Sequence, residues 1–313
     1  MATKNSNLHS AKRAKNDEFY TFMNDIDNEL NEYKDFFKGK VVYCNCDDAR
    51  ESNFFKYFSD AFEHLGLKKL ITTSYKENGK GVVLIYEGDK NGNKIVEDSE
   101  IEVRELEGNG DFRSAECIEF LKECDVVVTN PPFSLFREYV AQLMEYGKKF
   151  LIIGPMNAVT YKEIFPYIKN NELWLGQNAK GGTRKGNSLS FMTPTNEIKD
   201  VSAWWFTNID CKRKNTILET GCSYNEIDYP KYDNYGAIEC RKSHLVPMDY
   251  EGVIGVPISF LMFHCPTQFE IIDAREVGLT DKQKNKSTYL IKDADGAING
   301  KPTYARICIR KLS

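Results

Sequence analysis

The amino-acid sequence predicts an α/β fold with a mostly parallel sheet, antiparallel closure of that sheet and a smaller second region. Short apolar runs alternate with segments of helical periodicity between about residues 20 and 155. Each parallel pair of strands needs a crossover connection, and these helical segments supply it. After residue 211 the extended runs continue without strong helical periodicity, and the 313 residues exceed a typical single domain.

Helices are expected where apolar residues recur every three or four positions between end signals. The first expected helix ends at Gly39 and the second at Gly66, because glycine readily adopts the left-handed conformation that closes a helix. Ser114 can cap a third helix that runs to residue 123, and a fourth runs to residue 146. The apolar faces of the first, second and fourth helices contain Ile26, Leu30, Tyr33 and Phe37; Phe54, Phe55, Phe58, Ala61, Phe62 and Leu65; and Leu135, Phe136, Tyr139, Val140, Leu143 and Met144.

Strands are expected at short runs of apolar and β-branched residues bounded by turn residues. Two runs, 81–86 and 101–106, flank a polar turn and predict an inserted hairpin. Later runs are short and separated by turns, which indicates antiparallel closure of the sheet. The expected strands are 40–44, 69–74, 81–86, 101–106, 125–129, 150–153, 173–175, 188–192 and 203–207, with extended runs at 253–263, 269–274 and 304–311.

Composition predicts a folded protein of the cytoplasm. Hydrophobic residues make up 41% and charged residues 28%, which is ordinary for a globular protein with a core. The sequence has no run of about 18 apolar residues, and its N-terminus lacks the apolar stretch of a secretory signal. The 9 cysteines include Cys44 and Cys46 but no matched C-x-x-C pairs, so we expect neither disulfides nor a metal site.

The strand at 125–129 runs directly into Asn130, Pro131, Pro132 and Phe133. Two prolines prevent the chain from continuing as strand or helix. Open α/β sheets bind ligands beyond the carboxyl ends of their strands, so this turn presents one amide and one ring at a site position. Elsewhere in a sequence the same four residues would indicate a stiff loop with a packed Phe. Their place between a strand and a helix favours a site for a planar nitrogenous base.

Methyl transfer to an exocyclic amine explains each residue type in this turn. The side-chain oxygen of Asn130 and the carbonyl of Pro131 can accept the two amine hydrogens, and Phe133 can stack on the base. Accepting both hydrogens stabilises the positive charge that develops on the nitrogen, without a metal or a covalent intermediate. A base inside a duplex would have to flip out to reach this turn.

The turn after the first strand is a candidate cofactor site. It contains Asn45, Cys46, Asp47 and Asp48 in place of a glycine-rich G-x-G-x-x-G motif, which argues against a dinucleotide. Carboxylates at this place suit a cofactor that carries an amino group and a positive charge, as S-adenosylmethionine does. Each aspartate taken singly could equally cap the helix that follows.

Two further groups could contact such a cofactor. Asp111 and Phe112 follow an extended run and offer an acceptor for an exocyclic amine beside an aromatic ring, which would fit adenine. Tyr20 and Thr21 form an aromatic and hydroxyl pair before the first helix. Core packing would also explain these aromatics, so only the combination is informative.

Basic residues gather in the second half of the chain, although the net charge is -4. Nucleic-acid binding depends on where charge lies more than on its sum. Any single cluster would ordinarily be solvated surface charge. The candidate DNA-contacting residues are Lys180, Arg184 and Lys185 in a glycine-rich loop, and Lys212, Arg213 and Lys214.

These motifs together resemble those of the EcoRI-type adenine-specific DNA methyltransferases over nearly the whole chain. The segment that begins at Asn130 matches the family's catalytic motif, residues 16–21 match its N-terminal cofactor motif, and residues 110–114 match its adenine-contacting motif. Residues 255–261 and 268–272 are also similar to family sequence. The turn after the first strand departs from the wider superfamily because it lacks the glycine-rich signature.

The resemblance implies the Rossmann-like fold of S-adenosylmethionine-dependent methyltransferases and N6-adenine methylation of a specific sequence in double-stranded DNA. It implies a catalytic and cofactor-binding domain at 16–210 and a target-recognition region at 211–313. Residues 1–15 are polar and small, which predicts a flexible or partner-ordered arm. Asn130 would also contact the cofactor. We expect a monomer, and a cognate restriction endonuclease of the same system would not form a stable complex with it.

Two other functions compete with this hypothesis. Asn-Pro-Pro-aromatic turns also serve amino-methyltransferases that act on RNA or on a protein glutamine, and a labelled donor offered to all three substrates would separate them. A methyltransferase-like protein that binds DNA without turnover is the second alternative. The presence of both Asn130 and Phe133 argues against it.

Overall fold

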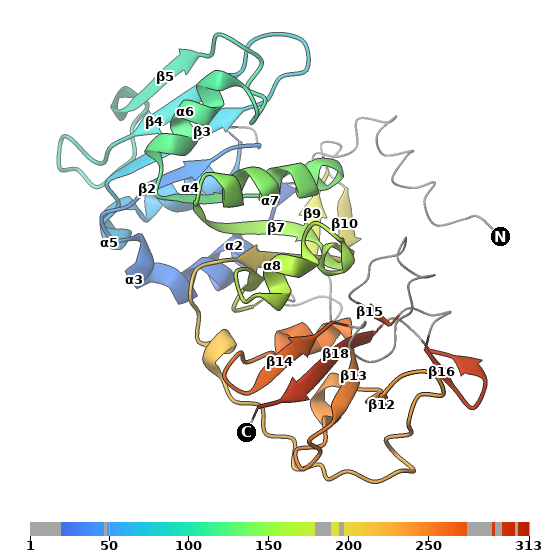
Figure 1. Cartoon of the computed structure of the whole chain (residues 1–313). Coiled ribbons are helices and arrows are strands. Elements are labelled where there is room, and N and C mark those ends of the chain that lie inside the picture. The colour runs from blue at the N-terminus through green and yellow to red at the C-terminus, as the bar shows by residue number, and fades with distance from the viewer. Residues whose placement is uncertain are drawn as a thin grey trace. The chain divides into compact units, whose positions relative to one another are not determined.

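The structure is a computed structural model, and it describes residues 20–46, 49, 51–178, 189–193, 197–273, 290–291, 296–303 and 306–312 (Figure 1). The chain divides into two compact units. The first comprises Met1–Met156 and Gly176–Ile209, and the second comprises Asn157–Leu175 and Asp210–Ser313. The predicted arm at 1–15 lies outside the described residues.

The first unit is built on a sheet whose central strands are parallel. Within this unit the strand order is β5-β4-β3-β2-β6-β7-β11. Strands β3, β2, β6 and β7 are parallel neighbours, whereas β4 and β5 extend one side and β11 closes the other in antiparallel pairing. This arrangement confirms the predicted α/β fold class. The strands are β2 (Val41–Cys44), β3 (Lys69–Ser74), β4 (Val82–Tyr86), β5 (Ile101–Glu105), β6 (Val126–Thr129), β7 (Lys149–Pro155) and β11 (Ala203–Thr207).

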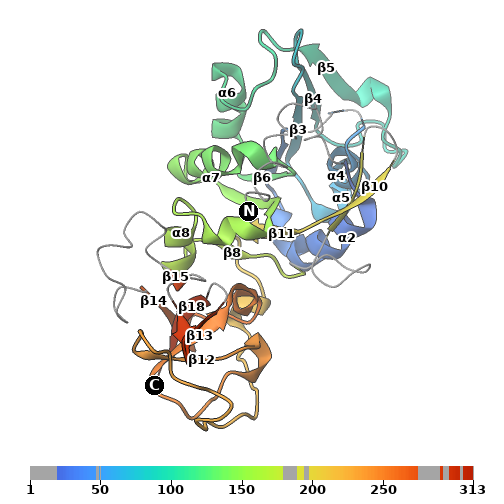
Figure 2. The same cartoon turned by 90° about the vertical axis from the view of Figure 1, so that its right-hand side faces the viewer.

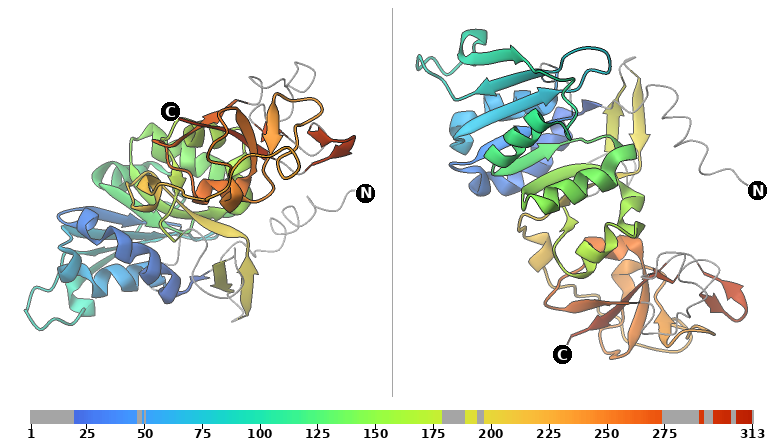
Figure 3. Two further views of the ribbon diagram at one scale, coloured as in Figure 1. Left: turned by 90° about the horizontal axis from the view of Figure 1, so that it is seen from below. Right: turned by 45° about the horizontal axis from the view of Figure 1, so that its top comes forward.

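Helices cover both faces of this sheet. In Figures 2 and 3 the strands lie between α6 and α7 on one side and α2, α4 and α5 on the other. The predicted hairpin is present as β4 and β5, and Ser114 caps α6 by accepting from the Cys117 N–H at 3.3 Å. The helices are α2 (Met23–Leu30), α3 (Lys34–Phe37), α4 (Asn53–Asp60), α5 (Phe62–Leu65), α6 (Ala115–Glu123) and α7 (Phe136–Glu145), with one-turn 3₁₀ segments η1 (Asn31–Tyr33), η2 (Asp98–Glu100) and η3 (Phe133–Leu135).

The first two predicted helices are each interrupted, although both end at the predicted glycines. η1 separates α2 from α3, and Ala61 leaves helical geometry between α4 and α5. Gly39 and Gly66 have φ values of 71° and 62°, the left-handed conformation that closes a helix. The apolar faces nevertheless pack as expected, for example Phe37 against Phe58 at 5.2 Å between ring centroids.

Every residue of β2 and β6 is buried, as the two covering layers require. A smaller antiparallel sheet in the same unit pairs β1 (Tyr20–Thr21) with β9 (Leu189–Met192) and β10 (Ile198–Val201). Thr21 pairs with Phe191 in this sheet. The β1 backbone is tied to the start of α4, because the Asn53 side-chain amide donates to the Thr21 carbonyl at 2.7 Å.

The second unit has a sheet of order β12-β13-β18-β14, in which β13, β18 and β14 pair antiparallel and β15 also pairs with β18. A buried ion pair, Arg306 to Glu239 at 2.6 Å, joins β18 to β12. The elements are α8 (Phe165–Lys169), β8 (Trp174–Leu175), β12 (Ala237–Glu239), β13 (Val253–Pro257), β14 (Phe269–Ile272), β15 (Leu290–Ile291), β16 (Ala297–Ile298), β17 (Lys301–Pro302) and β18 (Arg306–Lys311), with η4 (Met156–Thr160) after β7 and η5 (Arg213–Asn215), η6 (Ser243–Leu245) and η7 (Ile258–Met262).

The expected extended run at 253–263 is wrong in its second half. Strand β13 ends at Pro257, which lacks an N–H for the ladder, and the next five residues form the 3₁₀ helix η7. Its residues Phe260, Leu261 and Met262 are buried. A continuous apolar run does not distinguish a strand from a short buried helix, and here packing favours the helix.

Candidate active site

Two turns meet at the carboxyl ends of β2 and β6. The two strands are parallel neighbours, with Tyr43 opposite Val127. The residues that follow them, Asn45 and Asn130, therefore lie at the same edge of the sheet. The Thr129 hydroxyl, one residue before Asn130, donates to the backbone carbonyl of Asn45. The two turns are thus hydrogen-bonded to each other.

The 130–133 turn has a fixed backbone and partly exposed side chains. Pro131 is buried, whereas Asn130 and Phe133 are partly exposed. The turn leads into η3, whose Leu135 N–H donates to the Pro132 carbonyl at 3.0 Å, and then into α7. The side chains of Asn130 and Phe133 are therefore carried between a buried strand and a helix on stiff backbone.

Thr21 offers a buried hydroxyl that suits a ligand. Its side chain is 2% exposed, and Oγ1 has no hydrogen-bond partner among the described residues. A buried hydroxyl without a partner is costly, so a bound group that pairs with it would be stabilised. Tyr20 is partly exposed beside it on β1. The aspartates predicted for the cofactor, Asp47 and Asp48, lie outside the described residues.

Asp111 and Phe112 lie where a turn packs against the end of β3. Gly110 has φ 81°, and a Cβ there would lie 2.0 Å from the Ser74 carbonyl oxygen, so only glycine allows this approach. Phe112 is buried with its ring edge-on to Tyr139, at 5.0 Å between centroids. Arg113 binds the Asp111 carboxylate at 2.7 Å and holds its pKa below the usual range. Asp111 is therefore an ionised hydrogen-bond acceptor at neutral pH.

The sequence placed Asn45 in the candidate cofactor turn without a role for its side chain, and it did not single out Tyr139 as a site residue. The Tyr139 hydroxyl on α7 donates to Oδ1 of Asn45. Both side chains are buried. The spacing of Tyr139 predicted only an apolar helix face, and no local signal shows that its hydroxyl reaches a residue 94 positions away.

In the second unit, the basic residues 212–214 contact protein groups. Arg213 donates to the Leu261 carbonyl at 2.9 Å and to the Leu175 carbonyl. The Lys214 ammonium lies 3.7 Å from the centroid of the Trp174 ring, and Lys212 is exposed. The other predicted basic residues, Lys180, Arg184 and Lys185, lie outside the described residues.

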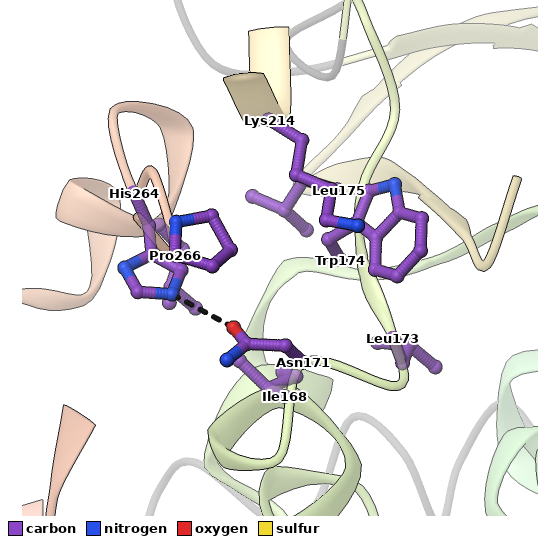
Figure 4. A pocket seen from close by; sticks show the side chains of 9 residues that line it. Ile168, Asn171, Leu173, Trp174, Leu175, Lys214, His264 and Pro266 are labelled. Carbon is purple, nitrogen blue, oxygen red and sulfur yellow. Dashed lines mark hydrogen bonds between the residues drawn. The ribbon is translucent and has the colours of Figure 1, made fainter. Parts of the chain in front are cut away.

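A small, mainly apolar pocket lies beside this segment (Figure 4). Its lining includes Trp174, Lys214 and His264, and His264 Nε2 lies 3.1 Å from Oδ1 of Asn171. Burial, together with the nearby Arg213 charge, lowers the pKa of His264 to about 4. The imidazole is therefore neutral at pH 7. Among the described residues no cluster of His, Cys, Asp or Glu could hold a metal ion.

The comparison with protein families is decisive. Residues 7–312 match the family model described as adenine-specific methyltransferase EcoRI. The chain belongs to this family. It is 46% identical to the type II methyltransferase M.EcoRI of Escherichia coli, over 98% of this chain and 96% of that protein. It is 37% identical to the type II methyltransferase M.MgeORF184P of Mycoplasma genitalium, over 97% of this chain and 98% of that protein.

A solved structure from Pyrococcus horikoshii, described as that of a candidate RNA methyltransferase, aligns with 67% of this chain and 100% of its own at a TM-score of 0.33 and 16% identity. Membership of the EcoRI family confirms the predicted resemblance, and the chain is a site-specific DNA methyltransferase. Such an enzyme takes DNA as its substrate, and its family implies a methyl donor of the S-adenosylmethionine type. In the described part of the chain, no helix is long and apolar enough to cross a membrane.

Proposed function

We propose that this enzyme transfers a methyl group from S-adenosylmethionine to N6 of an adenine in double-stranded DNA, at the 130–133 turn. The position of this turn in the fold is the main support for the proposal. It follows β6 at the carboxyl edge of the sheet and is hydrogen-bonded to the turn after β2 through Thr129 and Asn45. Acceptor and donor sites are expected to meet at this edge of an α/β sheet.

Asn130 and Pro131 would orient the amine. The Asn130 side-chain oxygen and the Pro131 carbonyl each accept one amine hydrogen, which directs the nitrogen lone pair toward the methyl group. Phe133 stacks on the base and holds its plane. S-adenosylmethionine, when bound, supplies the electrophilic methyl group and carries away the bonding electron pair on its sulfur. The acceptors of Asn130 and Pro131 stabilise the positive charge that builds up on the amine, and the methylated nitrogen then releases one proton to solvent water.

Residues near the carboxyl ends of the strands in the first unit's sheet would hold the cofactor. The Thr21 hydroxyl, which has no partner in the part of the chain that the structure describes, supports a polar contact there, and Tyr20 lies next to it. Asp111 keeps a negative charge that can accept from an amine, with Phe112 beside it. Asn130 would contribute to the cofactor side as well as the base side. Asp47 and Asp48 complete the proposed set, at the methionine end.

The DNA contacts would come mainly from the second half of the chain. We assign catalysis and cofactor binding to residues 16–210 and target recognition to residues 211–313. Phosphate contacts are proposed for Lys180, Arg184, Lys185, Lys212, Arg213 and Lys214. The target adenine would flip out of the duplex to reach Asn130. The enzyme would act as a monomer in the cytoplasm, and a cognate endonuclease would not bind it stably.

Replacing Asn130 tests this assignment. The Asn130→Ala variant removes one acceptor made in the transition state, so single-turnover methyl transfer from a labelled donor to duplex DNA should fall by about 10²- to 10³-fold. Asn31→Ala replaces an exposed asparagine in η1 and should retain the wild-type rate. Transfer by Asn130→Ala at the wild-type rate would contradict the catalytic role, and faster transfer to RNA or protein than to DNA would support the rival substrates.

A further inference from the structure

We propose that Tyr139 is a positioning residue that acts through Asn45 to fix the turn after β2 against the 130–133 turn. This inference rests on the proposed function of that turn. Asn45 accepts from both sides of the catalytic segment: its backbone carbonyl from Thr129, and its side-chain oxygen from Tyr139. Thr129 immediately precedes Asn130, and Tyr139 lies on the helix that follows Phe133.

All three residues are inside the core. Thr129 and Tyr139 are 0% exposed and Asn45 is 3% exposed, so these hydrogen bonds form away from bulk water. In such surroundings a buried polar group without a partner is costly, which makes one arrangement of the three strongly preferred. Burial also raises the pKa of Tyr139 well above its usual value. The hydroxyl therefore keeps its proton and remains a donor across the physiological range.

Asn45 also controls how the chain leaves β2. The next residue, Cys46, has φ 68°, a left-handed conformation that is unfavourable for residues other than glycine. Strained backbone persists when its neighbours hold it in place, and Asn45 is held by two hydroxyls. The backbone at Asn45, where the chain leaves β2, is thus held by groups on the two elements that flank the catalytic turn.

The rate of methyl transfer should depend on how firmly Asn45 is held by these two hydrogen bonds. The donor carbon and the amine nitrogen must meet in a narrow range of distance and angle, and misplacement by about 1 Å can lower a rate by about 10²-fold. Loss of the Tyr139 hydroxyl would leave its ring packed against Phe112 but release the Asn45 side chain. We therefore expect an effect on the rate of transfer larger than the effect on cofactor affinity.

Tyr43 provides a matched control in the same unit. It is also 0% exposed, and its hydroxyl shares a 2.8 Å hydrogen bond with Oγ1 of Thr73. That bond links β2 to β3 and does not involve Asn45. The Tyr43→Phe and Tyr139→Phe variants each remove one buried hydroxyl that has a partner, so their costs to stability should be similar.

The test compares the two full-length variants in single-turnover methyl transfer to duplex DNA, in binding of S-adenosylmethionine and in thermal unfolding. Tyr139→Phe should lose about 10-fold or more in transfer rate while the cofactor Kd changes by less than about 3-fold. Tyr43→Phe should transfer at nearly the wild-type rate. A wild-type rate in Tyr139→Phe, or equal rate losses in both variants, would overturn the inference.

Thr129→Val provides a second test of the hydrogen bonds to Asn45, for the case in which Tyr139→Phe does not fold. It removes the other donor to Asn45 and should also lower the transfer rate more than the cofactor affinity. A wild-type rate in Thr129→Val would overturn the role of Asn45. If Asn130→Ala is inactive while Tyr139→Phe and Thr129→Val are both fully active, only this inference fails. If Asn130→Ala is fully active, the proposed function of the turn fails as well.

Discussion

The 130–133 turn and the basic segment at 212–214 are both predicted as functional, yet they are built differently. The turn follows the buried strand β6 and contains two prolines, and it places the partly exposed side chains of Asn130 and Phe133 at the edge of a sheet. In the basic segment, Arg213 donates to two backbone carbonyls and Lys214 lies over the Trp174 ring. Protein contacts therefore hold Arg213 and Lys214 in place.

The difference shows that position carries more functional information than charge. A turn at the carboxyl end of a parallel strand is placed by the register of the whole sheet, so its side chains face the crevice where ligands bind. A cluster of cations has no such constraint, and each charge can serve the fold or a partner. The expected effects of substitution at the two places therefore differ in kind.

Of the three substitutions that test this comparison, the one at Phe133 should have the largest effect, and that effect is on catalysis. Stacking of a base on an aromatic side chain contributes about 1 to 3 kcal/mol, so Phe133→Ala should lower single-turnover methyl transfer by roughly 10- to 100-fold. Phe133→Trp keeps an aromatic face and should retain more activity than Phe133→Ala. Neither variant should change the thermal unfolding of the second unit. Equal activity in Phe133→Ala and wild type would contradict the stacking role of Phe133, because the turn would then resemble an ordinary loop.

A smaller effect, on stability, is expected at Arg213. Arg213→Ala removes hydrogen bonds from a charged donor to the carbonyls of Leu261 and Leu175, which should destabilise the second unit by about 2 kcal/mol. Denaturant unfolding monitored by tryptophan fluorescence, to which Trp174 contributes, measures this loss. Arg213→Lys should recover only part of it, since an ammonium cannot reproduce the guanidinium fork. Weaker DNA binding with unchanged unfolding would contradict the structural role of Arg213 and leave it as a phosphate contact alone.

The smallest effect is expected at Lys212, which is exposed. If this residue contacts a phosphate, Lys212→Ala should weaken binding to all duplex sequences by a similar few-fold factor. The slope of log K against log salt concentration should become shallower by about 1. Binding titrations at several salt concentrations measure both quantities. An unchanged salt slope would remove Lys212 from the DNA-contacting set and leave 212–214 a structural segment.

Local signals in the sequence were sufficient for much of the fold. The apolar run of β6 and the prolines after it defined a strand and a stiff turn, and Ser114 correctly marked the start of α6. Gly39 and Gly66 marked helix ends because their left-handed conformation is a property of the residue itself. Where the physical cause lies within a few residues, the sequence predicts the structure.

Features that depend on distant partners could not be predicted in this way. The bond from Tyr139 to Asn45 joins residues 94 positions apart, and Arg213 reaches a carbonyl 48 positions away. Nothing around Tyr139 distinguishes its hydroxyl from that of any tyrosine on an apolar face. The breaks in the first two helices and the turn of the chain into η7 likewise reflect packing that local propensity does not encode.

The central claim is that the 130–133 turn methylates adenine in DNA, and sequencing of DNA modification in cells tests it most directly. The wild-type enzyme would be expressed in a host that lacks DNA methylation, in parallel with Asn130→Ala. We expect N6-methyladenine in one sequence context with the wild-type enzyme and little or none with the variant. Absence of methyladenine with the wild-type enzyme, or equal methylation by both proteins, would contradict the claim.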